Sequence, residues 1–180
     1  MALNCVANAR LRDEGPFDDL WIQPAAGDAG SAVGAALHAY HVSAGQPRDA
    51  DPADGMSGAL LGPAPDLDQI AADLDAAGRP FLRIADEGQR AARVAELLDE
   101  GAVIGLFQGR MEFGPRALGN RSIVADPRRP EMQSVLNQKI KKRESFRPFA
   151  PAVLAEHAAE WFDLAAESPY MLRSEEHTSE

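Results

Sequence analysis

The sequence predicts a soluble α/β fold, on three observations. Stretches whose apolar residues recur every three to four positions, the period of an amphipathic helix, alternate with short apolar runs of strand length. The connections between them are mostly short and rich in Gly and Pro, which is the pattern of helices packed against a sheet. Of the 180 residues, 45% are hydrophobic and 26% charged, as in ordinary globular proteins.

The first 42 residues predict a helix, a strand and a second helix. Apolar residues between Met1 and Leu11 recur at helical spacing, and Leu-Trp-Ile at 20–22 reads as a short strand. A turn of small residues at 25–30 then leads into a helix with an apolar stripe. Asp28 stands where this helix begins, so its residue type alone favours a helix cap.

Residues 43–65 are rich in Gly, Pro, Asp and Ala and hold almost no large apolar residue, which predicts a linker. A second domain is therefore expected over 66–172. Its predicted elements alternate between helix and strand: helix 66–77, strand 81–84, helix 87–100, strand 102–107, loop 108–122, helix 130–142, extended segment 146–154 and helix 155–164. Pro148 and Pro151 limit the extended segment to an edge of a sheet.

Charge is distributed unevenly along the chain. The net charge is −10, yet residues 109–148 hold ten Lys and Arg against four Asp and Glu. Arginines gathered in this way outweigh a distant negative field within a Debye length of about 8 Å. The basic segment therefore predicts a site for a small anion, whereas the acidic remainder disfavours long polyanions and acidic membranes.

Glycine and arginine dominate the most informative part of this segment, residues 109–122. Glycine lets the backbone approach a ligand closely, and arginine offers a planar fork that matches phosphate oxygens. Three cations in tight irregular segments are expected at the anion site: Arg116, Lys141 and Arg147. Four others are expected to be solvated or paired with acidic residues: Arg128, Arg129, Lys139 and Lys142.

A long resemblance covers Gly105 to Pro151, which read GLFQGRMEFGPRALGNRSIVADPRRPEMQSVLNQKIKKRESFRPFAP. This stretch resembles the signature of the carbamoyltransferase family that includes nodulation-factor and antibiotic (tobramycin- and cephamycin-type) O-carbamoyltransferases. The resemblance implies a C-terminal YrdC-like α/β domain, of which residues 66–172 would form a truncated part. It also implies that carbamoyl phosphate and ATP are converted there to a carbamoyl-adenylate, from which a hydroxyl acceptor takes the carbamoyl group.

The resemblance also implies roles for particular residues. Arg116, Lys141 and Arg147 are expected to contact carbamoyl phosphate and the adenylate, as catalytic residues. Residues expected to hold ATP, with its Mg²⁺, are Arg110, Gly114, Asn120, Arg121, Ser122 and Arg143. Such fixed cations stabilise charge that develops on phosphoryl oxygens, so no nucleophilic side chain is required.

The N-terminal piece resembles the end of the family's larger domain, which belongs to the actin-like ATPase superfamily. The matching residues are ALNCVANARL and GPFDDLWIQPAAGDAGSAVGAAL. In that family the Asp of the AAGDAG turn helps to bind a divalent, iron-type metal, which implies a metal-ligand role for Asp28 in place of the helix cap. The His-x-x-x-His pair that completes the family's metal site is absent, and one carboxylate cannot hold a metal tightly.

The chain is expected to be an internal fragment, inactive by itself. Residues 173–180 are polar and resemble nothing in the family, which predicts a disordered, non-native tail. The start of the chain shows no secretory signal, so the cytoplasm is the expected location. RNA binding is an alternative that the basic segment suggests, but only Phe113 and Phe146 are available there to stack on bases.

Overall fold

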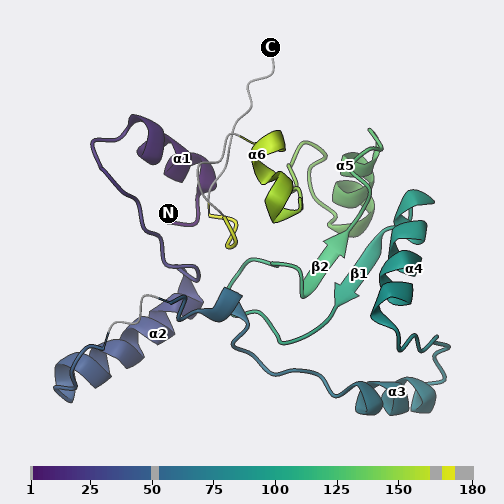
Figure 1. The fold of residues 1–180 in the computed structure, drawn as a ribbon, viewed down its shortest axis with the longest axis horizontal. Helices are drawn as coiled ribbons and strands as arrows, with labels where there is room; N and C mark the ends of the chain where they lie inside the picture. The colour runs from purple at the N-terminus through teal and green to yellow at the C-terminus, as the bar shows by residue number, and fades with distance from the viewer. Residues whose placement is uncertain (1, 50–52, 163–167, 173–180) are drawn as a thin grey trace. The chain divides into compact units, whose positions relative to one another are not determined.

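The structure is a computed structural model that describes residues 2–49, 53–162 and 168–172 (Figure 1). The chain forms two compact units. The first unit comprises Met1–Gly62, Met111–Leu118 and Ala152–Glu180, and the second comprises Pro63–Arg110 and Gly119–Pro151. The chain thus passes between the units once inside the predicted linker, and the loop predicted at 108–122 is shared between them.

Two helices of the first unit lie where the sequence predicts them. Helix α1 spans Cys5–Glu14, and the Asn4 side chain caps it by accepting from the N–H of Ala7. Helix α2 spans Asp28–His38 and continues into a π-helical turn, Ala39–Ser43. The strand predicted at 20–22 is wrong, since the segment has no pairing partner among the described residues and Trp21 is 76% exposed.

The C-terminal segment closes the first unit through polar contacts. The buried Asn8 amide donates to the carbonyl oxygens of Ala2 and Leu172, at 2.9 and 3.0 Å. The Tyr170 hydroxyl donates to the Asp54 carboxylate, which lowers the pKa of Asp54, and accepts from the N–H of Gly58 at 3.0 Å. Leu172 therefore contacts the first helix, and Tyr170 contacts residues 54–58. A short helix, α6 (Ala158–Trp161), follows a 3₁₀ turn.

The second unit begins with two helices that carboxylates cap. Helix α3 spans Leu67–Ala76 and α4 spans Glu87–Asp99, capped by Asp66 and Asp86 respectively. Both helices lie where the sequence predicts them. A side-chain oxygen that accepts from the first N–H groups stabilises the start of a helix. The strand predicted at 81–84 is wrong. That segment runs without a strand partner among the described residues, and Leu82 is 78% exposed.

One antiparallel pair of strands forms the sheet of the described residues. Strand β1 (Ile104–Phe107) pairs with β2 (Arg121–Val124), with Ile104 opposite Val124 and Phe107 opposite Arg121. Strand β1 was predicted, whereas β2 was not, and its first two residues lie in the loop predicted at 108–122. Helices together with this sheet confirm a mixed helix and strand fold.

After β2 the chain enters helix α5 (Met132–Val135), which continues as a π-helical turn, Leu136–Ile140. Together they confirm the helix predicted over 130–142. Met132 and Leu136 are buried, whereas Ile140 at the end of the turn is 45% exposed, so only the first part of this helix faces the interior. The segment expected to be extended at 146–154 forms no strand.

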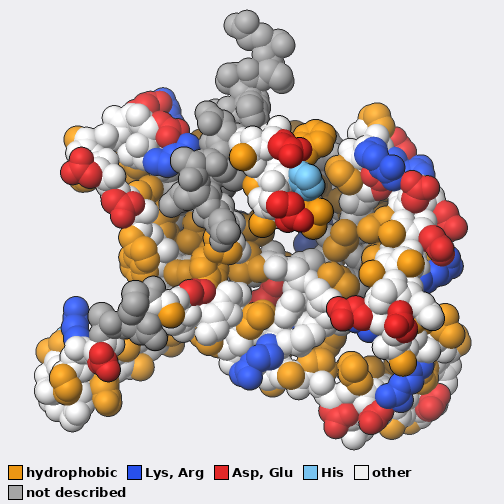
Figure 2. All heavy atoms as spheres, in the orientation of Figure 1, with side chains coloured by type: hydrophobic (Ala, Val, Ile, Leu, Met, Phe, Trp, Pro, Cys, Tyr) orange, Lys and Arg blue, Asp and Glu red, His pale blue; other side chains and the backbone are white. Residues whose placement is uncertain are grey.

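Charged side chains of both signs are interspersed over α3 and α4 on the face shown in Figure 2. Arg83 pairs with Asp68, and Arg93 pairs with Glu96. Exposed pairs of this kind contribute little to stability, typically about 0.2–1 kcal/mol. No helix in the described parts of the chain is long and apolar enough to cross a membrane.

Candidate functional site

The arginine-rich loop, defined as residues 108–120, connects β1 to β2 and is shared between the two units. Its two ends lie in the second unit and its middle, 111–118, in the first. Of the three predicted catalytic residues, Arg116 belongs to the first unit, and Lys141 and Arg147 belong to the second. Convergence of these three cations on one ligand stays a prediction.

Arg121 holds the two ends of this loop. One of its terminal nitrogens donates to the carbonyl oxygens of Gln108 and Asn120 at 2.6 and 2.8 Å, and the other donates to Gly109 at 3.3 Å. Its guanidinium also lies over the Phe107 ring, 3.6 Å from the centroid. Carbonyl contacts and stacking on an aromatic face both suit a guanidinium. Arg121 therefore orders the loop backbone, and its predicted contact with ATP is untested.

Glycine is required at one end of this loop. Gly109 has φ +52°, and a Cβ placed there would lie 3.0 Å from the Asn120 side-chain nitrogen. That nitrogen donates to the carbonyl oxygen of Arg110 at 2.9 Å. The neighbouring turn is closed by Ser122, whose hydroxyl accepts from the N–H of Gly119 at 3.0 Å. Asn120 and Ser122 thus support the loop from within.

The middle of the loop is fixed to the rest of the first unit. The N–H of Phe113 donates to the carbonyl oxygen of Ala59 at 2.7 Å. Gly114 adopts φ +126°, and a Cβ placed there would lie 3.3 Å from the Cβ of Ala25. Arg116 donates from a terminal nitrogen to the carbonyl oxygen of Leu3 at 2.7 Å. The Nε of Arg116 is buried and makes no hydrogen bond within the described residues. The hydrogen bond to Leu3 thus holds this half-buried guanidinium near the start of the chain.

The second basic group lies at the end of the π-helical turn. Lys141 ends that turn, its N–H donating to the Leu136 carbonyl at 2.9 Å, and its side chain is exposed. Arg147 is exposed and donates from Nε to Glu144 at 3.0 Å. The Glu144 backbone N–H and the Arg147 charge lower the pKa of Glu144, so the carboxylate is ionised at neutral pH. Lys141 and Arg147 are both accessible to an anion from solvent.

Asn137, which is not among the predicted site residues, organises this group. It is fully buried, and its amide nitrogen donates to the carbonyl oxygens of Ser145 and Arg147 at 3.0 and 2.8 Å. Its side-chain oxygen accepts from Nε of Arg143 at 2.6 Å. A signal did exist in the sequence: Gln133 lies four positions before Asn137, hence on the same helix face, and it too donates to Arg147, at 3.1 Å.

The backbone leaves this turn through a strained residue. Lys142 has φ +49°, and the next N–H, that of Arg143, returns to the Asn137 carbonyl at 2.9 Å. A left-handed backbone is readily adopted by glycine and poorly by β-branched residues. The reversal of the chain after Lys141 therefore depends on position 142 tolerating this conformation.

Replacing Lys142 by valine is expected to destabilise the chain by roughly 1–2 kcal/mol relative to Lys142→Gly, because only glycine accepts this backbone without cost. Urea unfolding of the two variants measures the difference. The same pair at Lys139, inside the turn, is the control, and there glycine is expected to be the less stable variant. The same order at both positions would contradict the strain.

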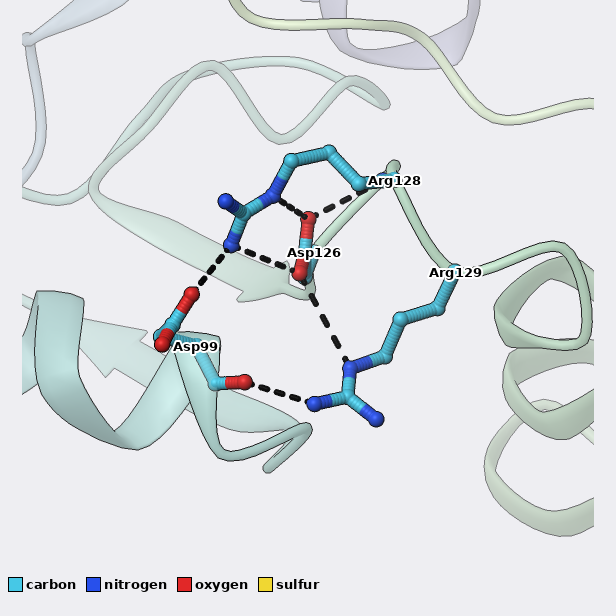
Figure 3. Close-up of polar contacts among 4 residues, drawn as sticks. All are labelled: Asp99, Asp126, Arg128 and Arg129. Atoms are coloured by element: carbon cyan, nitrogen blue, oxygen red, sulfur yellow. Dashed lines mark hydrogen bonds and ion pairs between the residues drawn. The ribbon is translucent and has the colours of Figure 1, made fainter.

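Four residues tie the end of α4 to the segment after β2 (Figure 3). Asp126 is 6% exposed and accepts from the backbone N–H of Arg128 at 2.9 Å and from its Nε at 2.8 Å. Arg128 also donates to Asp99 at 2.6 Å, and Arg129 donates to the Asp99 carbonyl at 2.6 Å. The hydrogen bonds from Arg128 lower the pKa of Asp126. The prediction that Arg128 and Arg129 pair with acidic residues is confirmed.

Asp28, the predicted metal ligand, is the first residue of α2. The helix-cap alternative is wrong, because Gly27 occupies the cap position and no side chain caps this helix. Asp28 is exposed. Among the described residues no group of three or more His, Cys, Asp and Glu is placed to hold a metal ion. A metal at Asp28 would need further ligands, and its role stays a prediction.

Two family models match this chain, one at each end. The model of the carbamoyltransferase C-terminus matches residues 95–180, which include the arginine-rich loop and the Asn137 group, and that of the carbamoyltransferase N-terminus matches residues 1–37. The chain belongs to the carbamoyltransferase family. This confirms the resemblance of both its ends to the two parts of carbamoyltransferases.

Three curated relatives show how much of such a protein the chain covers. It is 53% identical over 174 residues to an uncharacterized protein of Synechocystis, covering 96% of this chain and 28% of that protein. It is 48% identical to nodulation protein NolO of Bradyrhizobium diazoefficiens, covering 91% and 29%, and 42% identical to NolNO of Sinorhizobium fredii, covering 95% and 25%. The chain spans little more than a quarter of the length of these relatives.

Proposed function

We propose that this chain forms part of an ATP-using O-carbamoyltransferase and contributes its anion site. The observation that carries the proposal is the pair of accessible cations, Lys141 and Arg147, on a segment that a buried amide orders. Exposed cations attached to an ordered backbone fit phosphate and carbamate oxygens. The match to carbamoyltransferases suggests that the transferred group is a carbamoyl group.

The proposed reaction has three steps. Water first hydrolyses carbamoyl phosphate to carbamate and inorganic phosphate. A carbamate oxygen then attacks the α-phosphorus of ATP, and the bond to the β-phosphate breaks, so that carbamoyl-adenylate forms and pyrophosphate leaves. An acceptor hydroxyl, of a sugar or another metabolite, finally attacks the carbamoyl carbon, loses its proton and displaces AMP.

The residues act by stabilising charge. Negative charge grows on phosphoryl oxygens during attack at the α-phosphorus, and fixed cations lower that barrier when their contacts strengthen in the transition state. We assign this role to Arg116, Lys141 and Arg147. Residues assigned to ATP are Arg110, Gly114, Asn120, Arg121, Ser122 and Arg143. Mg²⁺ would enter with ATP and be held mainly by phosphates and water, which agrees with a donor set of cations and amides.

The family resemblance supports two finer assignments. We place residues 66–172 in a YrdC-like domain and residues 1–42 at the end of an actin-like domain, where transfer to the acceptor would occur. The exposed Asp28 carboxylate is chemically suitable for an iron-type divalent metal, with other ligands supplied from outside the described residues. Cytoplasmic location agrees with the use of ATP and carbamoyl phosphate.

Exchange of labelled pyrophosphate into ATP tests the proposal, because adenylate formation is reversible. In a protein of full family length that carries these residues, exchange is expected only when carbamoyl phosphate and Mg²⁺ are both present. Phosphate in place of carbamoyl phosphate is the control, and it should give none. Exchange at the same rate with and without carbamoyl phosphate, or no exchange under any condition, would refute the formation of a carbamoyl-adenylate.

A further inference from the structure

The Asn137 side chain has its hydrogen-bonding capacity directed at a single loop. Both of its donor directions meet loop carbonyls, those of Ser145 and Arg147, and its oxygen accepts from Arg143. Arginine can only donate, so the contact with Arg143 fixes which side-chain atom is the oxygen. A fully buried amide would be costly if these bonds were not made.

Asn137 does not bind a ligand itself. Its side chain is 0% exposed, and both its donor and acceptor atoms are used within the protein. What it fixes is the backbone of residues 143–147, which we name the Arg147 loop. Gln133 repeats the contact from one turn earlier, donating to Phe146 at 3.4 Å and to Arg147 at 3.1 Å.

The position of Asn137 in a π-helical turn adds to this argument. The turn is one residue wider than an α-helical turn, with the N–H of Lys141 reaching back to Leu136. The same short element therefore carries the buried amide near its start and is followed directly by Lys141. Arg143, held on the Asn137 oxygen, also lies over the Phe149 ring, 4.8 Å from the centroid, and fastens the far side of the loop.

We infer that Asn137 is a positioning residue for anion binding: its amide holds the Arg147 backbone so that the guanidinium is presented in one orientation. The inference rests on the proposed function, because it assumes that Arg147 binds the phosphate or carbamate group. It predicts that Asn137 affects ligand affinity through Arg147 and not separately from it.

The test uses Asn137→Asp, which has nearly the same shape, still accepts from Arg143 and loses the donors to Ser145 and Arg147. Calorimetric titration with carbamoyl phosphate, in a protein of full family length, is expected to show about tenfold weaker binding. With Arg147→Ala already in place, adding Asn137→Asp should change the dissociation constant less than about twofold, because residues that act as one unit are not additive. Amide hydrogen exchange at 145–147 should be faster in Asn137→Asp.

Two further variants keep the test decisive. Gln138→Ala is the matched control, since Gln138 is exposed in the same turn and its amide donates to Ser134 at 3.0 Å. If Asn137→Asp does not fold, Gln133→Ala is used in its place, since Gln133 is exposed and also donates to Arg147. It should weaken binding alone but add little when Arg147→Ala is already present. Circular dichroism of each variant establishes that it is folded.

The outcomes separate the inference from the proposed function. If Arg147→Ala weakens binding while a folded Asn137→Asp binds normally, or if the two losses add, the inference is overturned and the function stands. If Arg147→Ala leaves the affinity unchanged, the assignment of Arg147 fails, and the inference falls with it. Loss in both single variants with no further loss in the double variant supports the inference.

Discussion

Lys141→Ala is expected to lower carbamoyl phosphate-dependent ATP–pyrophosphate exchange by about a hundredfold or more, the usual effect of removing one group that stabilises transition-state charge. The ammonium group is exposed at the end of an ordered turn, where a phosphoryl oxygen can reach it. Arg116→Ala should have an effect of similar size. The initial rate of exchange at saturating ATP measures both.

Lys139→Ala is the matched control for charge, since Lys139 is exposed in the same turn and is predicted to be solvated. It should leave exchange within about twofold of the unchanged protein, as expected for a surface charge. Equal losses in Lys139→Ala and Lys141→Ala would mean that general positive charge matters and that Lys141 has no specific role.

Asp126→Asn is expected to lower the thermal unfolding midpoint more than any other single substitution in the cluster of Figure 3. Asp126 is nearly buried, and its carboxylate accepts from the backbone and guanidinium of Arg128. The substitution removes the negative charge and one of the two acceptor oxygens, which leaves donors of Arg128 unsatisfied. Asp99→Asn is the control, because that side chain is 73% exposed and its loss leaves the Arg128 contact with Asp126 in place.

The same substitution should change how stability depends on pH. Hydrogen bonds from Arg128 lower the pKa of Asp126 below the ordinary range of an aspartate, so the ionised carboxylate stabilises the fold above the pKa of the unfolded chain, and this contribution is lost as the pH falls through the lower pKa of the folded state. The unfolding midpoint of the unchanged chain should therefore drop between about pH 5 and pH 2, and less steeply in Asp126→Asn. Parallel profiles for the two proteins would show that Asp126 does not contribute.

Helices were predicted well from the sequence because their signals are local. Apolar spacing located α3 and α4, and capping carboxylates stand at the start of both. Strands depend on a partner, which local sequence does not reveal. The runs at 20–22 and 81–84 have the composition of strands but pair with nothing in the described residues, whereas β2 pairs with β1 although it follows a glycine-rich loop.

The candidate site shows the same division. Arg128 and Arg129 were expected to pair with acidic residues, and their neighbours in sequence supply Asp126. The use of Arg121 to hold three loop carbonyls could not be predicted, since it depends on how β2 pairs with β1. The role of Asn137 was not predicted, because a polar residue next to an apolar stripe can lie on either the buried or the exposed side of the helix.

The tail predicted at 173–180 lies outside the described residues, as does the end of the helix predicted at 155–164. The described part of that helix is shorter and begins as a 3₁₀ turn. Apolar side chains such as Trp161 and Phe146 are 67% and 77% exposed, and the expectation that the chain is an internal fragment, inactive by itself, stays a prediction.

Calorimetric titration of carbamoyl phosphate into a protein of full family length, with and without ATP and Mg²⁺, tests the central claim most directly. We predict saturable binding of one equivalent that Arg147→Ala and Lys141→Ala each weaken about tenfold or more. Binding that is absent, or that survives both substitutions unchanged, would contradict an anion site built on the π-helical turn and the Arg147 loop.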